Sequence, residues 1–227
     1  AKGASISGFP EWLPSERVVE QRVIDTLRKV FELNGFIGIE TRAVETGASL
    51  LKKGETSKEI YLLSRLQEVG HESDTPIEER LGLHFDLTVP LSRYVVEHSG
   101  ALAFPFKRWQ IQKVWRGERP QEGRFREFVQ ADIDVIGAGD LPDHYEVELP
   151  LVMVSALEEL RAYGLPKATV HANNRKLSEG FYRGLGLTDV FPHVEAQGAQ
   201  GADHRRPDHD QVGGHRPAGA KADEILV

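Results

Sequence analysis

Apolar residues recur every three or four positions over the segment 15–34, and this spacing predicts an amphipathic helix. Val23 and Phe31 lie on the apolar side, with charged residues between the apolar positions. Pro14 suits the first turn of a helix, and Gly35 suits its end. We therefore expect one long helix near the start of the chain.

Short runs rich in β-branched and aromatic residues predict strands. They lie at 36–40, at 60–64, in the first half of 81–90 before a turn, on both sides of 117–123, and at 168–172. Helical patterns follow at 91–100, 141–164, 176–186 and 221–227, with Pro150 expected to kink the second or mark its start. The two strands around 117–123 form a hairpin, which makes much of the sheet antiparallel. This order favours an α+β fold over a doubly wound one.

The segment 196–220 has a different composition from the rest of the chain. Its only aliphatic residue larger than alanine is Val212, so it cannot bury a core and is expected to be a loop or disordered. We therefore divide the chain into residues 1–190 and residues 191–227. The histidines of the second part have no carboxylate partners in a ligand pattern, and we expect no metal site there.

Composition and charge exclude several functions. The chain has 227 residues, and 40% of them are hydrophobic. This size suits one domain or one domain plus part of a second. The chain has no cysteine, no run of 18 apolar residues and no apolar signal region at its start, so we expect a cytoplasmic protein without a membrane span. A net charge of −7 disfavours a module that grips RNA by phosphate neutralisation alone.

Three of the predicted strands carry polar residues two positions apart, and such residues share one face. These sets are Asp86 and Thr88; Arg116 and Glu118; and Phe128, Gln130, Asp132 and Asp134. If the three strands are neighbours, the sets form one polar face with cations at one end and carboxylates at the other. The alternative is the solvent-facing side of an antiparallel sheet, which shows the same alternation. Phe128 favours a binding site, because an aromatic residue on a polar face commonly stacks on a base.

The string "RGERPQEGRFREFVQADIDVIG" resembles motif 2 of the class II aminoacyl-tRNA synthetases, and of the histidyl-tRNA synthetases in particular. "HFDLTVPLSRYV" is similar to the acid-x-Thr signature of that family. "GFPEWLPSERVVEQRVIDTLRKVFELNGFIGIET" is similar to its motif 1, although the usual proline is missing near residues 41–44. The resemblance covers about residues 8–190. It implies a class II synthetase-like antiparallel sheet flanked by helices.

The resemblance assigns four residues to ATP. Arg116 would bind the α-phosphate and stabilise charge at the pentavalent phosphorus. Glu118 would bind the adenine amino group, and Phe128 would stack under the ring. Arg124 would contact a phosphate or the acceptor end of tRNA. Mg²⁺ would be carried by the ATP phosphates.

The resemblance assigns four further residues to histidine. Asp86, Gln130 and Asp134 would hold its ammonium group and imidazole, and Thr88 would assist at the amino group. The family often has glutamate at the two aspartate positions. Because aspartate is one methylene shorter, water could bridge these contacts.

The implied function is ATP-dependent ligation of histidine to tRNA(His) through a histidyl-adenylate, in a homodimer formed through motif 1. The family's motif 3 and anticodon-binding domain have no match in this sequence. We therefore expect a catalytic domain truncated before motif 3 and inactive by itself, with 191–227 as the start of an insertion that is mobile or altered by a reading-frame error. The alternative is a non-catalytic synthetase-like regulatory subunit of ATP phosphoribosyltransferase. The set Arg116, Glu118 and Phe128 favours the ligase, because a regulatory subunit needs no adenine clamp.

Overall fold

The computed structural model describes residues 5–53, 59–68, 75–171, 175–186 and 224–226. The chain divides into two compact units, Ala1–Leu165 and Pro166–Val227. The boundary expected after residue 190, and the segment 196–220 expected to be a loop, lie outside the described residues.

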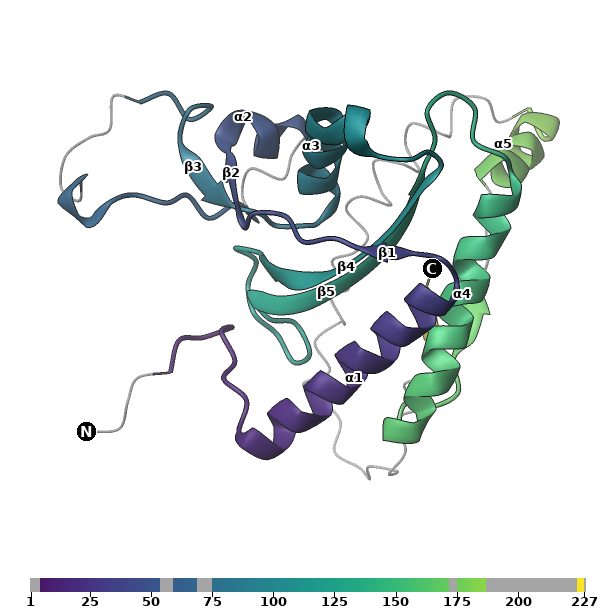
Figure 1. Ribbon diagram of the computed structural model, residues 1–227, viewed down its shortest axis with the longest axis horizontal. Helices are drawn as coiled ribbons and strands as arrows, with labels where there is room; N and C mark the ends of the chain where they lie inside the picture. The colour runs from purple at the N-terminus through teal and green to yellow at the C-terminus, as the bar shows by residue number, and fades with distance from the viewer. Residues whose placement is uncertain (1–4, 54–58, 69–74, 172–174, 187–223, 227) are drawn as a thin grey trace. The chain divides into compact units, whose positions relative to one another are not determined.

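The first unit contains both helices and strands (Figure 1). Its α-helices are α1 (Pro14–Leu33), α2 (Gly47–Leu50), α3 (Thr88–His98) and α4 (His144–Leu160). Short 3₁₀ turns lie at Leu51–Lys53, Leu66–Glu68, Ser99–Ala101 and Arg161–Tyr163. Its strands are β1 (Ile37–Gly38), β2 (Val44–Thr46), β3 (Leu81–Leu83), β4 (Phe106–Trp115) and β5 (Glu127–Ile136).

The strands form two sheets in this unit. The larger sheet has the order β1-β4-β5, in which β1 is parallel to β4 and β4 is antiparallel to β5. The smaller sheet pairs β2 with β3 antiparallel. The predicted α+β class and the predicted hairpin are confirmed, and the sheet is mixed because its short edge strand β1 runs parallel to its neighbour.

Helix α1 has the predicted position because its ends are specified locally. Pro14 is its first residue, where a proline costs no helical hydrogen bond. Glu16 Oε2 accepts a hydrogen bond from Leu13 N at 2.8 Å. At the other end Gly35 has a φ of +79°, and its amide donates to Glu32 O at 3.0 Å. A glycine with positive φ is a common stop for a helix. The helix is therefore closed at both ends by its own sequence.

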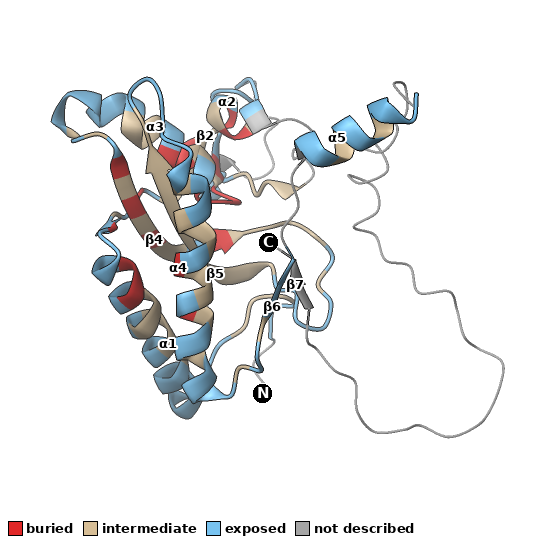
Figure 2. Ribbon diagram, turned by 90° about the vertical axis from the view of Figure 1, so that its right-hand side faces the viewer, coloured by how far each residue is buried: buried red, intermediate tan, exposed pale blue. Residues whose placement is uncertain are grey.

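One face of the larger sheet carries the hydrophobic core, against α1 and α4. The core contains Val30, Phe31 and Phe36 from the region of α1, and Val152 and Ala156 from α4. Partly buried Trp109, Ile111, Ile133 and Val135 of β4 and β5 pack against it. Figure 2 shows the two helices side by side. Pro150 lies inside α4, and the helix continues on both sides of it, so Pro150 does not mark the start of this helix.

Two predictions for the first unit were wrong in part. The run 60–64 is not a regular strand. Within it only Leu62 forms a β-bridge, with Gly82, because the run exchanges backbone hydrogen bonds with β3 over only a few residues. Helix α3 begins at Thr88, three residues earlier than predicted. The reason is that Asp86 Oδ1 accepts from Val89 N at 3.1 Å and caps the first turn. The short elements β2 and α2 were not predicted, and both are too short to show periodicity.

The second unit contains β6 (Thr169–His171), α5 (Arg175–Gly184) and β7 (Glu224–Leu226). The first two were predicted. The helix predicted at 221–227 is wrong: Glu224–Leu226 is a strand that pairs in parallel with β6. Seven residues are too few to distinguish the period of a helix from that of a strand. Pairing with a distant strand decides between the two structures. Across the described residues of both units, no helix is long and apolar enough to cross a membrane.

Candidate functional site

The register of the hairpin places polar side chains from both strands on the face opposite the core. Residues that pair across an antiparallel ladder share a face. The pairs are Arg108 with Asp134, Gln110 with Asp132, Gln112 with Gln130, and Val114 with Phe128. The face therefore extends along the whole of β4 and β5, whereas the polar pattern predicted only β5, the end of β4 and the run at Asp86.

The middle of this polar face is covered by protein. Arg108 and Gln110 are 0% exposed. Gln110 Nε2 donates to Thr41 Oγ1 at 2.9 Å, and Gln112 Nε2 donates to Thr41 O at 2.7 Å. The segment after β1 therefore lies over the middle of the face. The alternative that this face is the solvent-facing side of the sheet is wrong.

The run after β3 covers the end of the same face. Trp115 N donates to His84 O at 3.1 Å, and Arg116 Nε donates to Phe85 O at 3.0 Å. Asp86 is 4% exposed, and its negative charge helps to raise the pKa of Asp132. The run at Asp86 is thus a neighbour of the hairpin, but it is not a strand there: β3 ends at Leu83, and Thr88 begins α3.

Arg116 lies where the aromatic and the polar parts of the face meet. Its Nη2 donates to Gln130 Oε1 at 3.1 Å, and its guanidinium carbon lies 5.1 Å from the centre of the Phe128 ring. This is a cation–π arrangement. Since Arg116 donates to a backbone carbonyl and a carboxamide, its guanidinium is held from two sides beside a flat apolar ring.

The loop between β4 and β5 is held by backbone hydrogen bonds and by an ion pair between two of its own residues. Gln121 and Arg124 exchange two backbone hydrogen bonds, of 3.1 and 3.0 Å, around Gly123, whose φ is +74°. Arg124 Nε lies 2.7 Å from Glu118 Oε2. The two loop residues predicted to bind ATP are therefore paired with each other in this structure.

Glu127 forms a separate cluster at the base of the loop. Its Oε1 lies 2.6 Å from Lys113 Nζ, and its Oε2 accepts from Trp115 Nε1 at 2.8 Å. Burial raises the pKa of Glu127, but the hydrogen bonds from Lys113 and Trp115 and the charge of Lys113 outweigh it, so the pKa is lowered overall.

The other end of the face is acidic around one buried cation. Arg108 forms an ion pair with Asp134, although none of its N–H groups is aimed well enough at an acceptor in the described residues to count as a hydrogen bond. Burial lowers the pKa of Arg108, while Asp134 and Asp132 act in the opposite direction. Burial also raises the pKa of Asp132, aided by Asp134 and Asp86 and opposed by Gln130 and Arg108.

Sequence reasoning missed Arg108, and it did not give Asp132 a role. The signal was available for both: Arg108, Gln110 and Gln112 alternate along one strand, as do Gln130, Asp132 and Asp134 along the next.

A segment before α1 holds the hairpin from outside the sheet. The carbonyl of Gly8 accepts from Arg126 N at 2.7 Å and from Glu127 N at 3.0 Å. Arg126 Nε in turn donates to Glu118 O at 3.0 Å. The N-terminal segment thus supports the backbone of the loop that carries Glu118.

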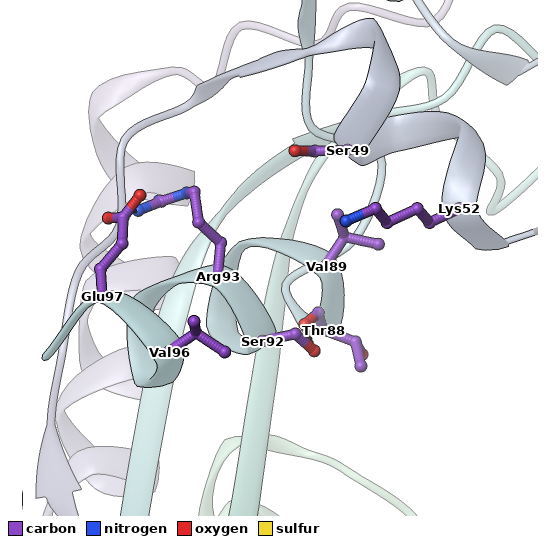
Figure 3. A pocket seen from close by; sticks show the side chains of 8 residues that line it. All are labelled: Ser49, Lys52, Thr88, Val89, Ser92, Arg93, Val96 and Glu97. Carbon is purple, nitrogen blue, oxygen red and sulfur yellow. Dashed lines mark hydrogen bonds and ion pairs between the residues drawn. The ribbon is translucent and has the colours of Figure 1, made fainter. Parts of the chain in front are cut away.

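Thr88 lies apart from this network. It is exposed at the first residue of α3, and it lines a groove of about 530 Å³ between α2 and α3 together with Lys52, Arg93 and Val96 (Figure 3). Its neighbour Asp86, by contrast, acts on the acidic end of the polar face.

The face offers a cationic hydrogen-bond donor that can bind an anion, an aromatic plane, and carboxylates, all within one site. Such a combination suits a ligand with a phosphate, a base and a cationic group. In the described ranges, no group of three or more His, Cys, Asp or Glu residues is placed to hold a metal ion.

The chain is similar to a family of known enzymes. A family model described as histidyl-tRNA synthetase matches residues 8–191. A histidine–tRNA ligase from Bifidobacterium animalis subsp. lactis is 91% identical over 190 residues, which cover 84% of this chain and 41% of that protein. One from Cutibacterium acnes is 60% identical over 185 residues, which cover 81% of this chain and 40% of that protein.

A solved structure shows the same fold. The crystal structure of histidyl-tRNA synthetase from Nostoc sp. PCC 7120 superposes with a TM-score of 0.58 at 41% identity, covering 70% of this chain and 34% of that one. The chain spans about two-fifths of the length of the curated relatives it matches.

Proposed function

Because this chain belongs to the histidyl-tRNA synthetase family, we propose that it supplies part of the catalytic domain that ligates histidine to tRNA(His) at the expense of ATP. Residues 1–190 would form the first part of this domain, and residues 191–227 would begin an insertion. The activity belongs to a cytoplasmic enzyme of protein synthesis.

The observation that carries the proposal is the position of Arg116. Its guanidinium lies over Phe128 on one side and donates to Gln130 on the other. A base stacked on Phe128 and an amino acid held at Gln130 would therefore bring the α-phosphate of ATP and the carboxylate of histidine to the same cation. Adenylate formation requires these two groups to meet.

ATP would bind at the loop end of the face. The adenine ring would stack on Phe128, and the carboxylate of Glu118 would accept from the adenine amino group. For this the ion pair between Glu118 and Arg124 has to open. Its opening releases Arg124 for a phosphate or the tRNA acceptor end. Mg²⁺ would enter on the ATP phosphates, whose charge it neutralises.

Histidine would bind at the acidic end. Asp86 and Asp134 are carboxylates that suit its ammonium group and an imidazole N–H, and Gln130 Oε1 adds a neutral acceptor. Thr88, which the resemblance assigns to the amino group, lines the groove between α2 and α3 in this structure, so a local rearrangement would have to bring it to the substrate. A site with several acidic groups favours a cationic amino acid head.

The chemical step needs no protein nucleophile. A carboxylate oxygen of histidine attacks the α-phosphorus in line, an O–P bond forms, and the bond to pyrophosphate breaks. Positioning of the two substrates and stabilisation of the growing negative charge supply the catalysis. Arg116 is the residue of this chain that would bind that charge. In the second step the histidyl group moves from the phosphate to a ribose hydroxyl of tRNA(His), and AMP leaves.

The motif 1 helix α1 and strand β1 would form a homodimer interface. Ile37 in β1 is 64% exposed, and Val18 and Val19 of α1 are about half exposed. Apolar side chains of this kind on neighbouring elements suit an interface with a second copy.

A regulatory subunit of ATP phosphoribosyltransferase is not favoured. The relatives at 91% and 60% identity are histidine–tRNA ligases. The residues proposed to bind adenine are also all present, and a protein that binds histidine alone has no use for them.

Histidine-dependent exchange of pyrophosphate into ATP tests the proposal, in a full-length synthetase that contains this sequence. We expect exchange with histidine and none with other amino acids. Gln130→Ala should raise the KM for histidine more than the KM for ATP, because losing one hydrogen bond to a charged ligand costs about 1.5–3 kcal/mol. Gln67→Ala, at an exposed glutamine in the turn Leu66–Glu68, is the matched control. Absence of exchange in the unaltered enzyme, or a raised ATP KM alone, would contradict the assignment.

A further inference from the structure

Gln130 has a carboxamide whose two ends have the same shape and opposite hydrogen-bonding character. Its Oε1 accepts from Arg116 Nη2 at 3.1 Å. Its Nε2 donates to both carboxylate oxygens of Asp132, at 2.9 and 3.1 Å. A guanidinium can only donate and an ionised carboxylate can only accept, so both neighbours select the same orientation of the amide.

Asp132 is itself placed by the sheet. It pairs in register with buried Gln110 on β4. It also lies two residues after Gln130 and therefore on the same face of β5. Its charge interacts with the buried charge of Arg108. The sheet thus places Asp132 on the polar face, where its carboxylate contacts the amide of Gln130.

We propose that Asp132 is a positioning residue for the amino acid substrate: it holds Gln130 Nε2, so that Gln130 Oε1 faces the site as an acceptor for the ammonium group of histidine. The inference rests on the proposed function, because it takes a cationic amino acid to lie against Gln130. The oxygen of a carboxamide has two lone pairs, so it can accept from Arg116 and from the ammonium group together.

Asp132 matters most when ATP is bound. The α-phosphate attracts the guanidinium of Arg116, which weakens its hold on Gln130 Oε1. Asp132 then remains to fix the amide. Without an acceptor-only partner the carboxamide can turn over, and its NH₂ would face a substrate group that is also a donor.

A double-mutant cycle in the pyrophosphate exchange assay tests this role, in the full-length synthetase that contains this sequence. At saturating ATP, Asp132→Asn should raise the KM for histidine about tenfold or more, with a smaller change in the KM for ATP. In the Gln130→Ala background, the same substitution should raise the histidine KM no further, because the group through which it acts is gone. Asp140→Asn, in an exposed loop after β5, is the matched control.

The outcomes separate this inference from the proposed function. An unaltered enzyme without histidine-dependent exchange overturns both. An active enzyme in which Asp132→Asn leaves the histidine KM unchanged overturns the positioning role alone. So does an equal rise in the presence and absence of Gln130, which would show that Asp132 acts on the ligand by its charge. If thermal unfolding shows that Asp132→Asn does not fold, Asp132→Ser completes the same cycle.

Discussion

Arg108 and Asp134 face each other across β4 and β5 and form an ion pair in which the guanidinium is fully buried. The Asp134 side chain is 39% exposed. The pair therefore reaches from the inside of the polar face to its open edge. A carboxylate proposed to bind histidine is thus held in place by a cation that never reaches solvent.

Replacing Asp134 by Asn should destabilise the protein. The buried charge of Arg108 loses its ion-pair partner, and breaking a buried pair from one side costs about 3–5 kcal/mol. Asp132 still interacts with Arg108 in the variant. Because the Asp134 side chain is 39% exposed, the pair is only partly buried, and we expect a smaller loss of about 1–3 kcal/mol. Urea unfolding measures it, with exposed Asp140→Asn as the control. Equal stability of the two variants would show that Arg108 does not depend on this pair.

Arg116→Ala should lower kcat and kcat/KM of pyrophosphate exchange together, in the full-length enzyme. The guanidinium acts mainly where negative charge gathers in the transition state, and losing one such donor costs on the order of 10²- to 10³-fold. Arg116→Lys should restore only part of the rate, since an ammonium group lacks the planar fork. Arg161→Ala removes a surface arginine paired with Glu158 and is the control. A normal rate with a slightly lower melting temperature would make Arg116 a structural residue.

Gly8→Ala should disturb the loop that carries Glu118. Gly8 has a φ of +84°, and a Cβ there would lie 2.9 Å from Arg126 Cγ. Gly139 has a φ of +105° with nothing within 4 Å of a Cβ, so Gly139→Ala carries the backbone strain without the contact. Both variants should lose about 1–3 kcal/mol of stability from strain. Only Gly8→Ala should also raise the KM for ATP in the exchange assay. The same ATP KM in both would exclude a role for the N-terminal segment in holding the loop.

Glu127 should contribute to stability in a pH-dependent way. Its pKa in the folded protein is lowered from the ordinary value of 4.5, so its contribution is present above that value and is lost as the pH falls through the lowered pKa. Lys113, its ion-pair partner, is more than half exposed. Glu127→Gln should therefore be less stable than the unaltered protein near pH 7 by at most about 1 kcal/mol. The difference should shrink as the pH falls below 4.5. Unfolding at a series of pH values measures it, with Glu122→Gln in the exposed loop as the matched control.

Local pattern was enough for the long elements and for the assignment of faces. The apolar period placed α1 within one residue at each end, and the alternation around 117–123 placed the hairpin. The polar positions of β5 share one face by their alternation alone, because side-chain direction along a strand follows from the backbone. The resemblance of the motif 2 string to the synthetases needed only the order of its residues.

Other features depend on parts of the chain that are far apart in sequence. Whether the polar face is wet or buried is decided by Thr41 and by the run around Phe85, which lie over it. The strand at Glu224–Leu226 exists through its pairing with β6.

The sequence by itself determined which residues could act together, since helix and strand periods fix the direction of each side chain. Only the tertiary structure decided which of them meet: Arg108 with Asp134, Gln130 with Asp132, and Gly8 with the backbone of Arg126. The physical reason is that burial and hydrogen bonding depend on contacts across many residues of chain, whereas periodicity depends on neighbours. A polar residue in a strand carries no sign of whether water or another polar group will satisfy it.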